Sequence, residues 1–133
     1  MKKTVICLFL FFTSFICLAQ LNAEAIVLKE SFPETYNIMR KTAIEKWDDD
    51  HEMIVYSINE ESKAWAEYLE LVRTGDSDVL FKAIEKWVDK RDKEKFYNAL
   101  RSEGVTNFMN VCRIDWGMVV YEYQNQIKAK NSY

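Results

Sequence analysis

The sequence predicts an all-α protein, an antiparallel four-helix bundle built from two duplicated helical hairpins with a short accessory helix. Three observations support this fold class. Apolar residues recur every three to four positions through most of the chain, which is the spacing of amphipathic helices. The 133 residues include only three glycines and one proline, too few for the many turns of a β-sandwich or barrel. Two parts of the chain also repeat each other.

Residues 1–19 have the pattern of a cleaved secretory signal peptide. Two lysines precede a 14-residue uncharged run, Val5 to Leu18, which is shorter than the ~20 residues of a membrane-spanning helix. Cys17 and Ala19 then supply small residues at −3 and −1 of a cleavage after Ala19. An uncleaved anchor and a lipid attached to Cys17 are the alternatives, although Ile16 is large for a lipoprotein signal.

The expected mature chain is secreted or periplasmic, with no stable membrane span after cleavage. It retains a single cysteine, so an intramolecular disulfide is impossible. Because Cys112 lies among apolar residues, we expect a small buried side chain; a reactive or dimer-linking thiol is the alternative, which leaves a homodimer open. The net charge of −3 and the lack of a basic run exclude nucleic acid as a partner.

The first expected helix follows a weakly patterned stretch. Residues 20–30 are interpreted as a flexible lead-in, so the single α-helical domain would span 31–133. Ser31 and Glu34 fit a capping box, and Pro33 suits the first helical turn. The helix should run to about Trp47. Its apolar stripe is Tyr36, Met39, Ala43 and Trp47.

The second and third expected helices form the centre of the chain. The second begins after the aspartates at 48–50 and ends at Arg73, with Gly75 as a left-handed cap. Its predicted stripe is Val55, Ile58, Ser62, Trp65, Leu69 and Val72. Asp76 or Ser77 should cap the third helix, which ends at Trp87. Its stripe is Leu80, Ala83 or Ile84, and Trp87.

The remaining chain predicts one short and one long helix. A mixed-charge stretch at 89–95 precedes an accessory amphipathic helix around 96–100, closed by Gly104. The long helix should begin near Met109, with lysines favouring its negative end. Its stripe is Met109, Cys112, Trp116, Val119, Tyr123 and Ile127.

An internal duplication is the clearest feature of the sequence. Residues 43–47 and 83–87 both read Ala-Ile-Glu-Lys-Trp, and six of fifteen residues are identical between 50–64 and 115–129. The two blocks are offset by 40 and 65 residues, so the second half carries about 25 extra residues, around 88–112. We therefore expect two related hairpins that close face to face with pseudo-two-fold symmetry.

The densest polar cluster, at 48–52, contains residue types that bind metal ions. Asp48 and His51 are three residues apart and would share a helix face. A di-metal carboxylate bundle needs two histidines, whereas this chain has one, and Trp116 occupies the position in the repeat that matches His51. A calcium loop would need alternating oxygen ligands and a glycine turn. A solvated helix start is therefore the favoured interpretation.

Asp50 and Asp115 are matched in the two repeats. We expect Asp115 inside the last helix, held by a structural hydrogen bond or ion pair; a paired-carboxylate acid–base site with Asp50 is the alternative. Tyr56 with Tyr121, and Trp47 with Trp87, would line a groove if the bundle is open at one end. The candidate polar or contact residues are Asp50, His51, Tyr56, Asp115 and Tyr121.

Catalytic signatures are missing from the sequence. It contains no G-x-S-x-G elbow, no glycine-rich phosphate loop and no Cys-x-x-Cys. We therefore predict a non-enzymatic protein without a cofactor, an interaction or binding module in the periplasm or at the cell surface with an unidentified protein partner. The alternative is a helical bundle that binds a small ligand or a metal through Asp50, His51 and Asp115.

Overall fold

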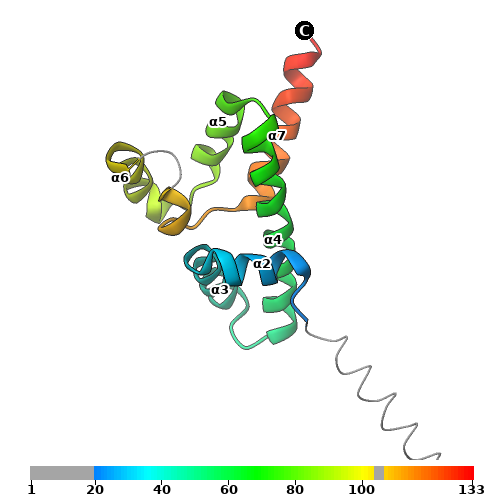
Figure 1. Ribbon diagram of the computed structural model, residues 1–133, viewed down its shortest axis with the longest axis vertical. Coiled ribbons are helices and arrows are strands. Elements are labelled where there is room, and N and C mark those ends of the chain that lie inside the picture. The colour runs from blue at the N-terminus through cyan, green and yellow to red at the C-terminus, as the bar shows by residue number, and fades with distance from the viewer. Residues whose placement is uncertain (1–19, 104–106) are drawn as a thin grey trace, which may run out of the picture.

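The computed structural model describes residues 20–103 and 107–133, and this part of the chain is all-helical, as predicted (Figure 1). The proposed signal peptide and Gly104 lie outside the described residues. Within those residues no helix is both long and apolar enough to cross a membrane. The elements are α2 Ala23–Ser31, α3 Pro33–Trp47, α4 His51–Thr74, α5 Ser77–Trp87, η1 Lys90–Asp92, α6 Lys93–Glu103, η2 Asn107–Asn110 and α7 Trp116–Asn131.

The 24-residue helix α4 is the central helix, and α2, α3, α5 and α7 all contact it. Figure 1 shows α2 and α3 beside one half of α4, with α5 and α7 beside the other half and α6 set to the side. α3 packs against α4, α5 packs against α7, and α4 and α7 contact each other. α3 and α5 make no contact in the described part of the chain. The closed four-helix bundle expected from the sequence is therefore not confirmed.

The lead-in expected over residues 20–30 is in fact helix α2. Asn22 caps it by accepting a hydrogen bond from the N–H of Ala25, and the side chains of Ala25 and Leu28 are completely buried. Two hydrogen bonds, both donated by Asn22, join the start of α2 to α4. The Asn22 N–H donates to Asn59 Oδ1 at 2.8 Å, and the Asn22 side-chain amide donates to the main-chain oxygen of Asn59 at 3.0 Å. Two buried residues one turn apart are too short a pattern to reveal a helix from sequence.

The capping box expected at Ser31 is also absent from the fold. Ser31 is the last residue of α2, and Phe32 precedes α3 without a side-chain capping hydrogen bond. Because Ser31 is itself helical, it cannot adopt the extended backbone of an N-cap. Pro33 does occupy the start of α3, as predicted.

Helix α4 begins as the sequence predicts and then departs from the predicted stripe. Asp50 accepts a hydrogen bond from the N–H of Met53 at 3.2 Å and caps the helix. The stripe is correct in its middle but wrong at its C-terminal end, where Leu69 and Val72 are exposed. Different helices cover the two halves of α4, so the buried face rotates along its length. The buried residues are Ile54, Ile58, Ser62, Trp65 and Tyr68.

Gly75 ends α4 for a different reason from the one predicted. Its φ is −93°, so it is not a left-handed cap. A Cβ atom at this position would lie 2.6 Å from the hydroxyl oxygen of Tyr123. That hydroxyl accepts a hydrogen bond from the N–H of Asp76 at 2.9 Å. Glycine is therefore required by the close approach of Tyr123 to the α4–α5 turn.

The last helix begins at Trp116 rather than near Met109. Asp115 stands outside the helix with φ −81° and ψ 89°, and its carboxylate accepts from the N–H of Met118 at 3.1 Å. Asp115 is therefore an N-cap like Asp50, not a mid-helix residue. The expectation that Cys112, Trp116, Val119 and Tyr123 are buried is confirmed.

We expect Leu28→Ala to lower the free energy of unfolding by about 2–5 kcal/mol, because it leaves a cavity under α2. The matched control is Val27→Ala in the same helix, where the side chain is 53% exposed and the change should stay within about 0.5 kcal/mol. Urea unfolding followed by circular dichroism measures both. Equal, negligible effects would show that residues 23–31 are not part of the core.

Candidate functional site

A cavity of about 390 Å³ opens between α3, α4 and the segment that leads into α7. One wall comes from α3, a second from the first half of α4, and a third from residues 109–116. The lining combines apolar, aromatic and charged side chains. They include Met39, Ala43, Lys46, Trp47, Tyr56, Glu60, Glu61, Trp87, Asp89, Met109, Arg113, Asp115 and Trp116.

The structure divides the candidate residues predicted from sequence. Tyr56 and Asp115 line this cavity, and so do Trp47 and Trp87, the pair expected to line a groove. Asp50 and His51 lie at the start of α4 and Tyr121 on an exposed face of α7, outside the cavity lining. Asp50 therefore does not meet Asp115 in this cavity. In residues 20–103 and 107–133, no three His, Cys, Asp or Glu side chains are grouped to hold a metal ion.

The acid that joins Asp115 is Glu61, which the sequence interpretation missed. Its carboxylate crosses from α4 to the start of α7, where it accepts from the N–H groups of Trp116 at 2.8 Å and Gly117 at 3.2 Å. Two carboxylates, those of Glu61 and Asp115, therefore serve the same helix N-terminus. The available signal was spacing, since residue 61 lies three after Ile58 and four before Trp65 on the buried stripe.

The environment of Glu61 changes its acidity. Burial and then the nearby charge of Asp115 raise the pKa of Glu61 to about 7, although the hydrogen bonds from Trp116 and Gly117 act in the opposite direction. Near neutral pH this carboxyl group exchanges between its neutral and charged forms. Such a group in a cleft can hold a proton or balance a bound cation.

The two indole rings of the cavity wall belong to the last residues of α3 and α5. Trp47 is the last residue of α3, and its Nε1 donates to the hydroxyl of Ser57 at 2.8 Å, which fixes the ring against α4. Trp87 is the last residue of α5, and its buried Nε1 has no hydrogen-bond partner among the described residues. The ammonium groups of Lys46 and Lys86 lie 5.1 and 5.8 Å from these two ring centres.

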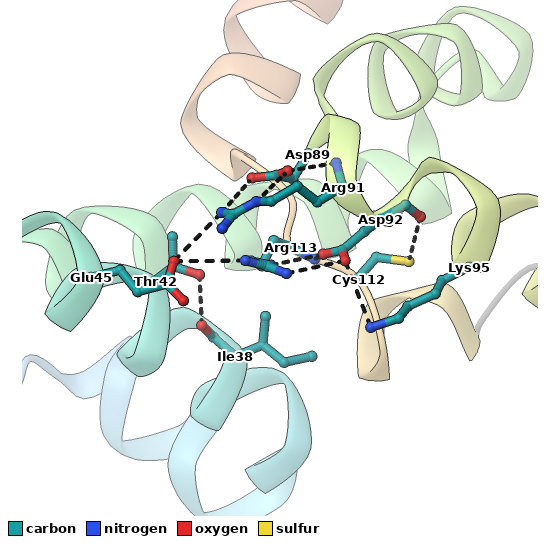
Figure 2. A network of polar contacts seen from close by, with 9 residues as sticks. All are labelled: Ile38, Thr42, Glu45, Asp89, Arg91, Asp92, Lys95, Cys112 and Arg113. Carbon is teal, nitrogen blue, oxygen red and sulfur yellow. Dashed lines mark hydrogen bonds and ion pairs between the residues drawn. The ribbon is translucent and has the colours of Figure 1, made fainter.

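A polar network holds the third wall of the cavity in place (Figure 2). Asp92 is 1% exposed, and its Oδ2 accepts from the main-chain N–H of Arg113 at 2.8 Å and from Arg113 Nε at 2.9 Å. Arg113 also pairs with Glu45 on α3 at 3.7 Å, and Arg91 bridges Asp89 and Glu45. These ion pairs attach residues 89–113 to α3.

Burial favours the neutral form of Asp92, but the hydrogen bonds and charge of Arg113 outweigh it and lower the pKa of this carboxyl group. Cys112 lies beside it and is buried, as predicted. Burial, with the charge of Asp92, raises the pKa of the Cys112 thiol to about 11. The thiol is therefore neutral at physiological pH, and a reactive role is not favoured.

Comparisons of the chain with models of known families, with curated proteins and with solved structures find no match.

We expect Asp92→Asn to destabilise the protein by on the order of 3 kcal/mol at pH 7, because it removes the buried and nearer charge partner of Arg113 and leaves Glu45, at 3.7 Å, as the more distant one. Since the pKa of Asp92 is lower in the folded state, its stabilising effect is present above the unfolded pKa of about 4 and disappears as the pH falls through the folded value. The difference between variant and wild type should therefore narrow below about pH 4. Urea unfolding at several pH values measures it.

The control for this experiment is Glu70→Gln, which removes an exposed ion pair with Arg73. Its effect should stay within about 0.5 kcal/mol. Equal effects of the two substitutions at pH 7 would contradict the anchoring role of Asp92.

Proposed function

We propose that this protein is an exported, non-enzymatic binding module that takes a small, partly apolar ligand into the cavity between α3, α4 and residues 109–116. The cavity itself carries the proposal. Its volume of about 390 Å³ lies within the range of about 300–1,000 Å³ typical of small-molecule sites. Its mixture of indole, thioether and aliphatic side chains with a few charged groups is also typical of such sites.

Export is part of the proposal and is supported by the pattern of residues 1–19. A basic start, a 14-residue uncharged run and small residues before the cleavage position are the three parts of a secretory signal. The absence of recognisable catalytic motifs from the sequence supports a binding role rather than an enzymatic one.

The duplication of the hairpins also remains part of the proposal. In the first half, the N–H of Asp50 donates to the main-chain oxygen of Trp47 at 3.0 Å; in the second, the N–H of Asp115 donates to that of Trp87 at 3.3 Å. The same closure therefore spans three residues in one half and 28 in the other. This similarity supports an ancestral hairpin turn that received an insertion, and it does not require a closed bundle.

Contact with a protein partner is the second candidate function. Tyr56 and Tyr121 occupy matching positions in the two repeats, and their side chains are 58% and 57% exposed. Tyrosine provides a large contact area with a polar end, which is why it is frequent in protein interfaces. Tyr56 also lines the cavity, so a partner that covers it would lie beside the ligand site.

Methionine methyl NMR tests the cavity with a neutral probe, 2-phenylethanol. We expect the probe to shift the ε-methyl signals of Met39 and Met109, which line the cavity, while those of Met53 and Met118 stay unchanged. Thr42→Trp places a large ring at the cavity wall and should abolish the shifts. Asn37→Trp, at another exposed position of α3 outside the lining, should leave them intact.

Unchanged Met39 and Met109 signals at millimolar probe would overturn the small-ligand function. Equal shifts in wild type and Thr42→Trp would do the same, because they would place the probe elsewhere.

A further inference from the structure

The charges on the cavity wall are unevenly balanced. Among the acids, Glu60 pairs with Lys63 at 3.5 Å and Asp89 with Arg91 at 3.1 Å. In the part of the chain that the structure describes, neither Glu61 nor Asp115 has a lysine or arginine within ion-pair distance.

The two basic groups on the wall lie against partners other than these two acids. Arg113 is held by Asp92 at 2.9 Å and by Glu45 at 3.7 Å. The ammonium group of Lys46 lies 5.1 Å from the ring centre of Trp47. The wall therefore offers a negative region at Glu61 and Asp115 that neither basic group neutralises by an ion pair.

The helix N-terminus at this place is not a site for an anion. Its first N–H groups, those of Trp116, Gly117 and Met118, already donate to the carboxylates of Glu61 and Asp115. These carboxylates of the protein itself therefore compensate the positive end of the α7 dipole. A ligand that reaches the two acids therefore meets carboxylate oxygens rather than free N–H groups.

Aromatic side chains share the cavity with these acids. Trp47, Tyr56 and Trp87 all line it, and the faces of such rings attract cations. Lysine ammonium groups already lie 5.1 and 5.8 Å from the centres of the two indoles. Carboxylates beside aromatic rings are the combination that recognises an ammonium group attached to an apolar body.

We propose that the ligand of this cavity is an organic cation, with its ammonium group against Glu61 and Asp115 and its apolar or aromatic body among Trp47, Tyr56 and Trp87. This inference rests on the proposed function and names the class of molecule that the cavity takes. Carboxylates and phosphates are not the preferred ligands, because among the described acids that line the cavity Glu61 and Asp115 lack a lysine or arginine partner and would repel an anion bound beside them.

Three probes with the same phenyl ring separate charge from shape: 2-phenylethylammonium, 2-phenylethanol and 3-phenylpropanoate. Titrations of the full-length protein, followed through the methyl signals of Met39 and Met109, give each dissociation constant. At pH 8 we expect the ammonium to bind at least about tenfold more tightly than the alcohol, because one charge-assisted hydrogen bond is of that magnitude. The carboxylate should bind most weakly.

Glu61→Gln provides the matched variant, since the amide oxygen can still accept from the N–H of Trp116 or Gly117. We expect the preference for ammonium over alcohol to fall to within about twofold, with the alcohol still shifting the signals of Met39 and Met109. Glu67→Gln neutralises another acid of α4, outside the cavity, and should keep the wild-type preference. Shifts of these signals on addition of the alcohol show that each variant retains the cavity.

The preference for the ammonium probe over the alcohol should also grow as the pH rises from 6 to 8, because the carboxyl group of Glu61 then loses its proton. The other charged groups that line the cavity with it are Lys46 of α3, Glu60 of α4, and Asp89, Arg113 and Asp115. In Glu61→Gln this pH dependence should disappear.

The outcomes distinguish the two proposals. Equal affinity for ammonium and alcohol, or tighter binding of the carboxylate, would overturn the cationic ligand and leave the small-ligand function intact. A preference that survives Glu61→Gln would also overturn it. Failure of all three probes to move the Met39 and Met109 signals would overturn the proposed function itself.

Discussion

The hydrogen bonds that the Glu61 carboxylate accepts at the start of α7 are the interaction on which the placement of α7 against α4 depends. They fix the N-terminus of α7 near the middle of α4, so α5 and α7 lie beside one half of α4 while α2 and α3 lie beside the other. In this arrangement the space between α3 and residues 109–116 is a cavity. The favourable hydrogen bonds and helix dipole at this position are opposed by burial and by the charge of Asp115, which together raise the pKa of Glu61.

A second constraint comes from the contacts of the residues between Trp87 and Asp115. An antiparallel bridge joins Val88 to Ile114. Phe96 contacts Phe108 with ring centres 5.3 Å apart. The buried Asp92–Arg113 pair is connected to α3 through Glu45. These contacts hold residues 109–116 in the position where they form a cavity wall.

The sequence predicted the features that depend on local chemistry and missed those that depend on tertiary contacts. Asp50 and Asp76 cap helices as expected, because an aspartate before an amphipathic run satisfies free N–H groups in almost any context. The sequence places the start of α7 too early because the partly buried Met109 and the buried Cys112 lie at helical spacing without being part of that helix. The sequence match between 50–64 and 115–129 does indicate the correct start, because it aligns Asp115 with Asp50, the N-cap of α4. Spacing shows only that Glu61 lies beside the buried stripe of α4. Its role depends on where the start of α7 meets α4, and no local pattern specifies that contact.

The most direct test of the central interaction is the acidity of Glu61, measured by carbon-13 NMR titration of its carboxyl carbon in the native protein. We expect a midpoint near pH 7, and a lower midpoint in Asp115→Asn, because that variant removes the neighbouring charge while keeping a capping side chain. A midpoint near the ordinary value of 4.5, unchanged by Asp115→Asn, would show that Glu61 is not held against Asp115 at the start of α7.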